Sequence, residues 1–195
     1  MVRKNQDLKK LMTNITFITG NQSKADYFSR QMGIDIPHVK VELDELQSID
    51  LHEIVAHKLK QAYEAVQGPV LVEDVSLVFT ALGDLPGPYI KWFVEYAGPA
   101  ACCQMLDGFD DRSAVIRCTF GYYDGETMEF FDSELTGEIS ERPRGENGFG
   151  FDTFFIMGGY DKTRAELPQA EVEKTYAEKM KPFAKVREFL KARVQ

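Results

Sequence analysis

The stretch ITFITGNQSKADYFSRQMG, residues 15–33, sets the pattern on which the fold prediction rests. Its first five residues form a β-branched run, typical of a buried strand, which Gly20-Asn21 stops with a turn. Asn21 is a favourable N-cap residue, and residues 22–32 have a helical periodicity that ends at Gly33. We therefore expect a strand, a turn and a helix in direct succession.

The next segments repeat this order. Residues 39–43 predict a second strand ahead of an acidic loop, and Asp50 is expected to cap a helix that runs to residue 66. The apolar run 70–72 predicts a third strand. Strands that alternate with helices favour an α/β unit with a mainly parallel sheet.

The rest of the chain predicts shorter elements of mixed type. Asp124-Gly125 is a strong hairpin signal between two predicted strands, and Pro182 is expected to break the closing helix. The predicted elements are a loop at 83–88, short helices at 89–96 and 99–106, strands at 114–123, 128–139 and 153–156, and a helix at 171–194. The sheet is therefore expected to be mixed.

Length and charge narrow the possible functions. The 195 residues fit one domain, predicted at 14–195 after a polar extension at 1–13 that lacks the apolar core of a signal peptide. The net charge of −8 argues against nucleic acid or an anionic membrane as the main partner. Small polyanions that bind with a divalent metal remain possible partners.

Three cysteines, Cys102, Cys103 and Cys118, make an odd number without a Cys-x-x-Cys motif. A disulfide framework or a zinc site is therefore not favoured, and a reducing cytoplasm fits this pattern best. His52 and His57 are also poor partners for one metal, because their spacing puts them roughly 140° apart around a helix.

The turn TGNQSK, residues 19–24, is a candidate phosphate site. It joins a strand to a helix N-terminus, where backbone N–H groups and the helix dipole attract anions. Gly20 lets the backbone approach a ligand, and Lys24 adds a positive charge on the first helical turn. The alternative interpretation is an ordinary capped turn followed by a surface lysine.

Glu73 and Asp74 are candidate metal ligands because they end an otherwise apolar strand. Ligands of open α/β sheets bind beyond the carboxyl ends of the strands. Neighbouring strand residues point to opposite faces, so we expect at most one of the two to line a given cleft. Mg²⁺ usually takes one or two carboxylates plus substrate phosphates, and the loop 42–45 offers a third acid.

The segment RGENGFGFD, residues 144–152, combines glycines with two aromatic rings. Phe149 and Phe151 are either core residues or rings that a flexible loop presents. The glycines at 148 and 150 favour presentation, and aromatic faces in such loops often stack on a nucleobase.

Four blocks in one order resemble the inosine/xanthosine triphosphate pyrophosphatase family. They are TGNQSK at 19–24, QGPVLVED at 67–74, ALGDLPGPYIKWF at 81–93 and GFGFD at 148–152. The resemblance implies an elongated α/β fold, a mixed sheet flanked by helices, with a nucleotide cleft between two lobes, and a homodimer. It also implies hydrolysis of ITP, dITP and XTP to the nucleoside monophosphate and pyrophosphate, with Mg²⁺ as the cofactor or Mn²⁺ in its place.

The same resemblance assigns roles to individual residues. Asp74 is the implied catalytic residue, as proton acceptor for the attacking water, and it is also a metal ligand together with Glu45. Phe149 is implied to stack on the base. The implied substrate-binding residues are Thr19, Gly20, Asn21, Lys24, Lys58, Val75, Lys91, Phe149, Gly150, Phe151, Asp152 and Lys174.

The sequence departs from the family pattern in three ways. Val75 replaces the hydroxyl residue that follows the aspartate, and Phe151 stands where the family often has tryptophan or tyrosine. The family's Ser-His-Arg near the C-terminus is missing from the corresponding stretch EKTYAEKM, residues 173–180. Lys179 offers one hydrogen-bond donor there, whereas Glu178 is an acceptor, so an altered base preference is expected.

Two other functions fit the sequence. A nucleotide-binding protein with weak or lost hydrolase activity would keep the phosphate end without the base-recognition pair. A structural dimerisation domain would require Lys24, Glu45 and Asp74 to lie apart.

Overall fold

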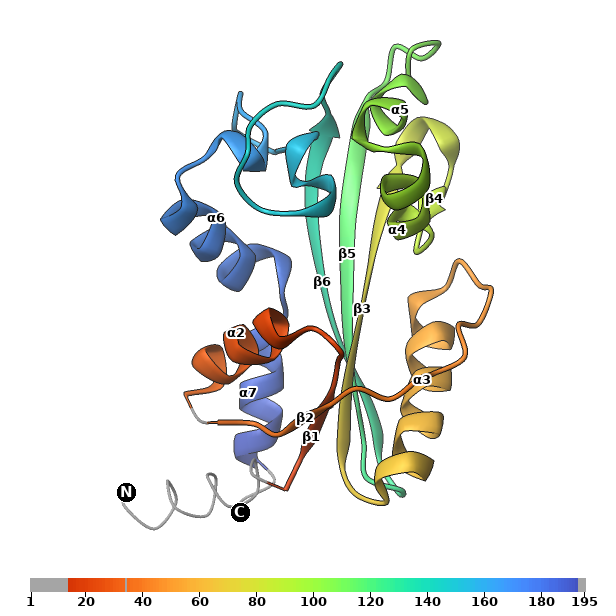
Figure 1. The fold of residues 1–195 in the computed structure, drawn as a ribbon, viewed down its shortest axis with the longest axis vertical. Coiled ribbons are helices and arrows are strands. Elements are labelled where there is room, and N and C mark those ends of the chain that lie inside the picture. The colour runs from red at the N-terminus through yellow and green to blue at the C-terminus, as the bar shows by residue number, and fades with distance from the viewer. Residues whose placement is uncertain (1–13, 34, 193–195) are drawn as a thin grey trace. The chain divides into compact units, whose positions relative to one another are not determined.

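The computed structural model describes residues 14–33 and 35–192. Figure 1 shows its helices and strands. In chain order the main elements are β1 (Thr16–Ile18), α2 (Gln22–Met32), β2 (His38–Val39), α3 (Leu51–Val66), β3 (Val70–Phe79), β4 (Pro86–Gly87), α4 (Ile90–Trp92), α5 (Pro99–Gln104), β5 (Ser113–Tyr123), β6 (Met128–Ile139), β7 (Phe155–Met157), α6 (Gln169–Thr175) and α7 (Phe183–Ala192). The shorter turns are the 3₁₀ helices η1 (Thr80–Leu82), η3 (Gly150–Thr153) and η4 (Arg164–Glu166) and the π-helical segments η2 (Phe93–Ala97) and η5 (Tyr176–Met180). The extension expected at 1–13 lies outside the described residues.

The expected mixed sheet is confirmed. Its strand order is β2-β1-β3-β5-β6-β7, with β4 paired to β3. β1 runs parallel to β2 and β3, whereas β4 is antiparallel to β3 and β7 is antiparallel to β6. The parallel pairs arise because α2 and α3 each return the chain to the same end of the sheet.

The described chain divides into two compact units, with boundaries inside β3, β5 and β6. Unit 1 comprises residues 14–33, 35–74, 119–132 and 182–192, and unit 2 comprises residues 75–118 and 133–181. No helix within the described residues has the length and apolar character that a membrane span requires.

In unit 1, one face of the sheet packs against α3. Gly121 of β5 permits this close approach, because a Cβ there would lie 2.4 Å from Val55 Cγ1 and 2.7 Å from Leu59 Cδ1. The buried cluster on this face comprises Ile18, Val55, Leu59, Ala62, Val70 and Val72.

The opposite face of the unit 1 sheet packs against α2 and α7 (Figure 1). Side chains alternate along β1, so Phe17 points away from the face that holds Ile18. The ring centroid of Phe17 lies 4.8 Å from that of Phe28 in α2, and Phe28 lies 5.8 Å from Phe183 in α7. These buried rings fix both helices on the sheet.

The helix ends predicted for unit 1 are confirmed. Asn21 Oδ1 accepts a hydrogen bond from the Lys24 amide at 3.1 Å, and Gly33 ends α2 with φ of 77°. At the start of α3, Asp50 Oδ1 accepts from the His52 amide at 2.7 Å. Because caps are local contacts, both helices could be delimited from the sequence.

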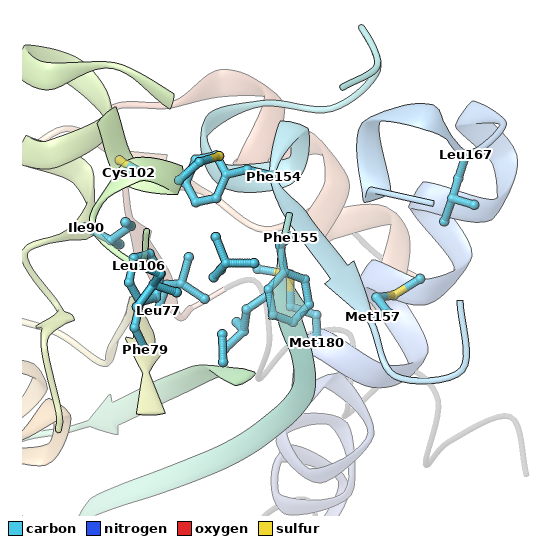
Figure 2. Close-up of a cluster of buried hydrophobic side chains, with 14 of the residues drawn as sticks. Leu77, Phe79, Ile90, Cys102, Leu106, Phe154, Phe155, Met157, Leu167 and Met180 are labelled. Carbon is cyan, nitrogen blue, oxygen red and sulfur yellow. The ribbon is translucent and has the colours of Figure 1, made fainter. Parts of the chain in front are cut away.

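Unit 2 has a separate hydrophobic core (Figure 2). It holds the short helices α4 and α5, which are too short to be stable alone. Its labelled members are Leu77, Phe79, Ile90, Cys102, Leu106, Phe154, Phe155, Met157, Leu167 and Met180. The two short helices, the hairpin strands β5 and β6, and the break at Pro182 between η5 and α7 agree with the sequence predictions.

Two strand predictions are wrong in extent. The strand expected at 39–43 is confined to β2, because its partner β1 ends at Ile18, which pairs with Val39. The strand expected at 70–72 continues to Phe79, so Glu73 and Asp74 lie in the middle of β3. The segment expected as a loop at 83–88 contains the short strand β4, which pairs with β3.

The thiols provide a test of the unit 2 core. All three cysteines are free and buried, and burial raises the pKa of Cys102 to about 11, with a smaller contribution from Cys103. Burial also raises the pKa of Cys103. At neutral pH we expect no reaction of the native protein with DTNB, because the thiolate is the reactive form. In guanidinium all three thiols should react, and rapid labelling of native protein would contradict the packing.

Candidate functional site

The β1–α2 turn has the geometry of an anion site. Thr19 Oγ1 accepts a hydrogen bond from the Asn21 amide at 3.1 Å, and Asn21 in turn caps α2. No acidic residue lies in the first turn of α2. A Cβ on Gly20 would lie 3.1 Å from the Lys40 side chain, so a larger residue at position 20 would crowd Lys40. The positive end of the α2 dipole is therefore not neutralised by a nearby carboxylate of its own first turn.

Lys24 of this turn pairs with the first acid of β3. Its Nζ lies 3.7 Å from Glu73 Oε1. The Glu73 side chain is only 6% exposed, whereas Lys24 is 34% exposed. A nearly buried carboxylate thus holds a lysine that remains accessible at the helix N-terminus.

Lys58 of α3 pairs with the second acid. Lys58 Nζ donates to Asp74 Oδ2 at 2.5 Å, and both side chains are largely buried. Val72, two residues before Asp74, packs with α3, so alternation puts Asp74 on the α3 face and Glu73 on the α2 face. The expectation that the two acids point to opposite faces is confirmed.

Glu73 and Asp74 lie beside the carboxyl end of a strand. The strand that ends there is β1, whereas the two acids belong to β3. Thr16 and Phe17 pair with Val70 and Leu71, so the same register carried two residues further puts Thr19 beside Glu73. β1 ends at this point and the chain turns into α2. The location agrees with the rule for ligand sites in α/β sheets, with β1 as the strand that ends.

The loop that carries Glu45 is attached to α3. Gln61 Oε1 accepts from the Asp44 amide at 2.9 Å, and Gln61 Nε2 donates to the Asp44 carbonyl at 3.3 Å. Gln61 follows Lys58 by three residues, so both occupy one side of α3. Glu45 itself is exposed. Lys24 and Lys58 therefore contact consecutive residues of β3, Glu73 and Asp74. The Glu45 loop is attached to α3 at Gln61, close to Lys58 in the sequence.

No three His, Cys, Asp or Glu side chains of residues 14–33 and 35–192 form a group that could hold a metal ion. An all-protein cage is not what Mg²⁺ needs, because it commonly takes one or two carboxylates and completes its shell with phosphates and water. The carboxylates of Glu45 and Asp74 offer the hard oxygen ligands that suit this ion.

In unit 2, Phe149 is a presented ring and Phe151 is a packed one. Phe149 is 61% exposed, whereas Phe151 is partly buried against the unit 2 core. The Phe149 amide donates to Asp152 Oδ2 at 3.1 Å. Gly148 has φ of 77°, and a Cβ there would lie 2.3 Å from Asp152 Oδ2, so only glycine fits. Of the two alternatives that the sequence leaves open, presentation by a loop therefore applies to Phe149, and packing in the core applies to Phe151.

A buried ion pair that sequence analysis missed anchors this loop. Arg164 Nε donates to Asp152 Oδ1 at 2.6 Å, and the exposed fractions of the two side chains are 0% and 5%. The same Asp152 carboxylate thus binds Arg164 through one oxygen and the Phe149 amide through the other. No local pattern around Arg164 marks it, because the contact joins η4 to η3 across 12 positions.

The other predicted unit 2 residues are dispersed. Val75 packs against the unit 2 core, and Lys91 lies over the Trp92 ring at 5.1 Å. Lys174 is exposed on α6. In the stretch that replaces Ser-His-Arg, Glu178 is exposed and Lys179 lies over the Tyr160 ring at 5.7 Å.

These features define a mixed α/β protein whose β1–α2 turn has the geometry of an anion site next to lysine–carboxylate pairs, a combination suited to phosphorylated ligands. Comparison with known proteins is more specific. The model of the Ham1 family matches residues 15–189. The chain belongs to the Ham1 family, and the resemblance seen in the four sequence blocks is confirmed.

Two relatives bear the name inosine triphosphate pyrophosphatase. The protein of Scheffersomyces stipitis is 40% identical over 194 residues, and that of Candida albicans is 37% identical over 202 residues. Each alignment covers 92% of this chain and 98% of the relative.

Solved structures confirm the fold. The Staphylococcus aureus Ham1 protein superposes with a TM-score of 0.80 at 24% identity, over 92% of this chain and 98% of that one. A nucleoside-triphosphatase, described as a dITP/XTP pyrophosphatase, from Mycobacterium abscessus gives 0.74 at 20% identity, over 88% and 97%. The Ham1 protein of Coxiella burnetii gives 0.76 at 22% identity, over 92% and 97%.

The buried ion pair gives a stability prediction. Arg164→Met leaves the Asp152 carboxylate buried without its cation, which should lower the free energy of unfolding by about 3–5 kcal/mol. Urea denaturation measures this change. Lys162→Met, an exposed substitution of the same kind two residues away, should change stability little. Equal effects of the two substitutions would contradict a structural role for the pair.

Proposed function

We propose that this chain is a metal-dependent nucleoside triphosphate pyrophosphohydrolase. Its proposed substrates are ITP, dITP and XTP, and its products are the nucleoside monophosphate and pyrophosphate. The names of the two relatives that are 40% and 37% identical support this reaction. The observation that carries the proposal is the pairing of Glu73 with Lys24, at the N-terminus of α2, and of Asp74 with Lys58 of α3, since it places carboxylates and cations next to the β1–α2 turn.

The triphosphate is assigned to the turn of Thr19, Gly20 and Asn21 together with Lys24 and Lys58. Attack at the α-phosphorus builds negative charge on the pyrophosphate leaving group, so cations that face this group accelerate the reaction. The α2 N-terminus and the two lysines supply such positive charge. Lys91 and Lys174, both exposed, are proposed as further phosphate contacts from unit 2.

Glu45 and Asp74 are the proposed ligands of Mg²⁺, or of Mn²⁺ in its place. When bound, the ion neutralises charge on the phosphate oxygens. Asp74 is proposed to accept the proton of the attacking water, and its hydrogen bond from Lys58 orients the carboxylate. Water is the expected nucleophile, because a water whose proton a carboxylate accepts needs no Ser or Cys side chain to attack the phosphorus.

The base is assigned to unit 2, where Phe149 offers an exposed ring for stacking. Gly150, Phe151 and Asp152 are proposed to shape the loop beside it. The Ser-His-Arg motif is missing, so we propose that base preference is altered.

A nucleotide-binding protein with weak or lost hydrolysis is the second candidate. One observation favours it. Recognition of a purine oxygen requires a buried hydrogen-bond donor, and both Glu178 and Lys179 are exposed. Binding without hydrolysis would support it. The homodimer, the cytoplasmic location and the single domain at 14–195 stay predictions, and the free thiols are in keeping with a reducing compartment.

A substrate panel tests the proposed function directly. With Mg²⁺ or Mn²⁺ present, we expect pyrophosphate and the monophosphate from at least one of ITP, XTP, GTP and dATP. Coupled pyrophosphate detection and chromatography of the nucleotide measure both products. The absence of pyrophosphate with every nucleotide would overturn the hydrolase proposal, and calorimetry with the same panel would then test binding.

Substitution of the two proposed metal ligands tests their roles. Asp74→Asn should lower kcat by at least a factor of about 10² while the protein stays folded, because the proton acceptor is lost. Glu45→Gln should raise the Mg²⁺ concentration needed for half-maximal rate. Asp44→Asn is the matched control in the same loop, and its effect should be small because Gln61 binds only the Asp44 backbone. An active Asp74→Asn enzyme would refute the assignment.

A further inference from the structure

The exposed Phe149 ring is held in place through two separate contacts. Its backbone is fixed by Asp152, as described above. Its ring lies against Tyr176 of η5, with ring centroids 6.5 Å apart and an interplanar angle of 62°. The neighbouring residues Gly148 and Gly150 have no side chains that could restrict the Phe149 rotamer, so the contact with Tyr176 serves this purpose.

The geometry of the two rings decides what Tyr176 can do. A base sandwiched between two rings needs them parallel and about 7 Å apart, which is twice the usual carbon–carbon contact of 3.5 Å. At 62° the two rings meet edge to face instead, which is a favourable aromatic arrangement. Tyr176 therefore supports Phe149 from one side rather than forming the second half of a sandwich.

Tyr176 is itself in contact with Lys181. Lys181 Nζ lies 4.9 Å from the centre of the Tyr176 ring, and the lysine is only 4% exposed. The Lys181 amide donates to the Tyr176 carbonyl at 3.1 Å, a bond that spans five residues and closes the π-helical turn. Pro182 then ends the segment. The same short turn thus fixes both the backbone and the ring of Tyr176.

We propose that Tyr176 is a positioning residue for the nucleobase, which holds the Phe149 ring so that its open face is ready to stack on a purine. The inference rests on the proposed function, and it adds a residue outside the matched family motifs. A preordered ring loses less rotamer entropy when the base binds, so affinity for the base rises without a new contact to the phosphates.

This role predicts an effect confined to the base. Tyr176→Ala should raise KM for ITP, or for the best substrate of the panel, roughly 2- to 10-fold, the range expected for one edge-to-face aromatic pair. The value of kcat should stay within about twofold, because Asp74 and the phosphate contacts are untouched. Inorganic tripolyphosphate, which has no base, should inhibit wild type and variant with the same Ki.

Three further variants separate positioning from a general effect on the fold. Tyr176→Phe keeps the ring and should behave as wild type. Tyr160→Ala removes a nearby ring that pairs with Lys179 and Glu171 instead, and should leave KM for the nucleotide unchanged. In a Phe149→Ala background, Tyr176→Ala should cause no further rise in KM, because its effect passes through Phe149.

Full-length protein is used throughout, with thermal melts to verify folding. If Tyr176→Ala is not folded, Tyr176→Leu replaces it, since leucine keeps apolar volume but has no ring edge. An unchanged KM for the nucleotide, an equal rise in the tripolyphosphate Ki, or additive effects with Phe149→Ala would each overturn the inference and leave the proposed function intact. A wild-type protein that neither hydrolyses nor binds any nucleotide would overturn both.

Discussion

Two neighbouring carboxylates in the middle of a buried strand are the constraint on which the rest of unit 1 depends. Burial of an unpaired carboxylate costs several kcal/mol, so a strand such as β3 tolerates Glu73 and Asp74 only if cations reach them. Because side chains alternate, one cation has to come from each face of the sheet. α2 supplies Lys24 on one face and α3 supplies Lys58 on the other. The acid pair therefore requires a cation at one position of each helix, Lys24 in α2 and Lys58 in α3.

This arrangement also explains how an acidic chain can bind an anionic substrate. The two lysines balance the two carboxylates, so the carboxyl end of β1 gains no net negative charge from β3, although the chain as a whole carries −8. The positive end of the α2 dipole then remains effective at short range, where a phosphate would bind. The net charge determines the electrostatic potential far from the protein surface, and salt at ordinary concentrations screens this potential beyond about 10 Å.

Much of this could be predicted from the sequence where the determining contacts are local. The caps Asn21 and Asp50, the Asp124-Gly125 hairpin and the break at Pro182 each depend on neighbours within a few residues. Long-range contacts were not predictable in the same way. The end of β2 depends on where β1 stops, and the Arg164–Asp152 and Tyr176–Phe149 contacts join segments that no periodicity connects. The roles of Glu45, Asp74 and the other site residues rest on motif resemblance and stay predictions.

The base site proposed above offers the exposed ring of Phe149 for stacking, and this has a consequence for selectivity. Stacking tolerates many bases because each has a π face. Strong discrimination arises instead when a mismatched base leaves a buried donor unpaired, which costs the desolvation energy of that donor. Glu178 and Lys179 are exposed, so water can satisfy them whichever base is bound. We therefore expect weaker discrimination among purines here than in a protein that reads the base with a buried donor pair.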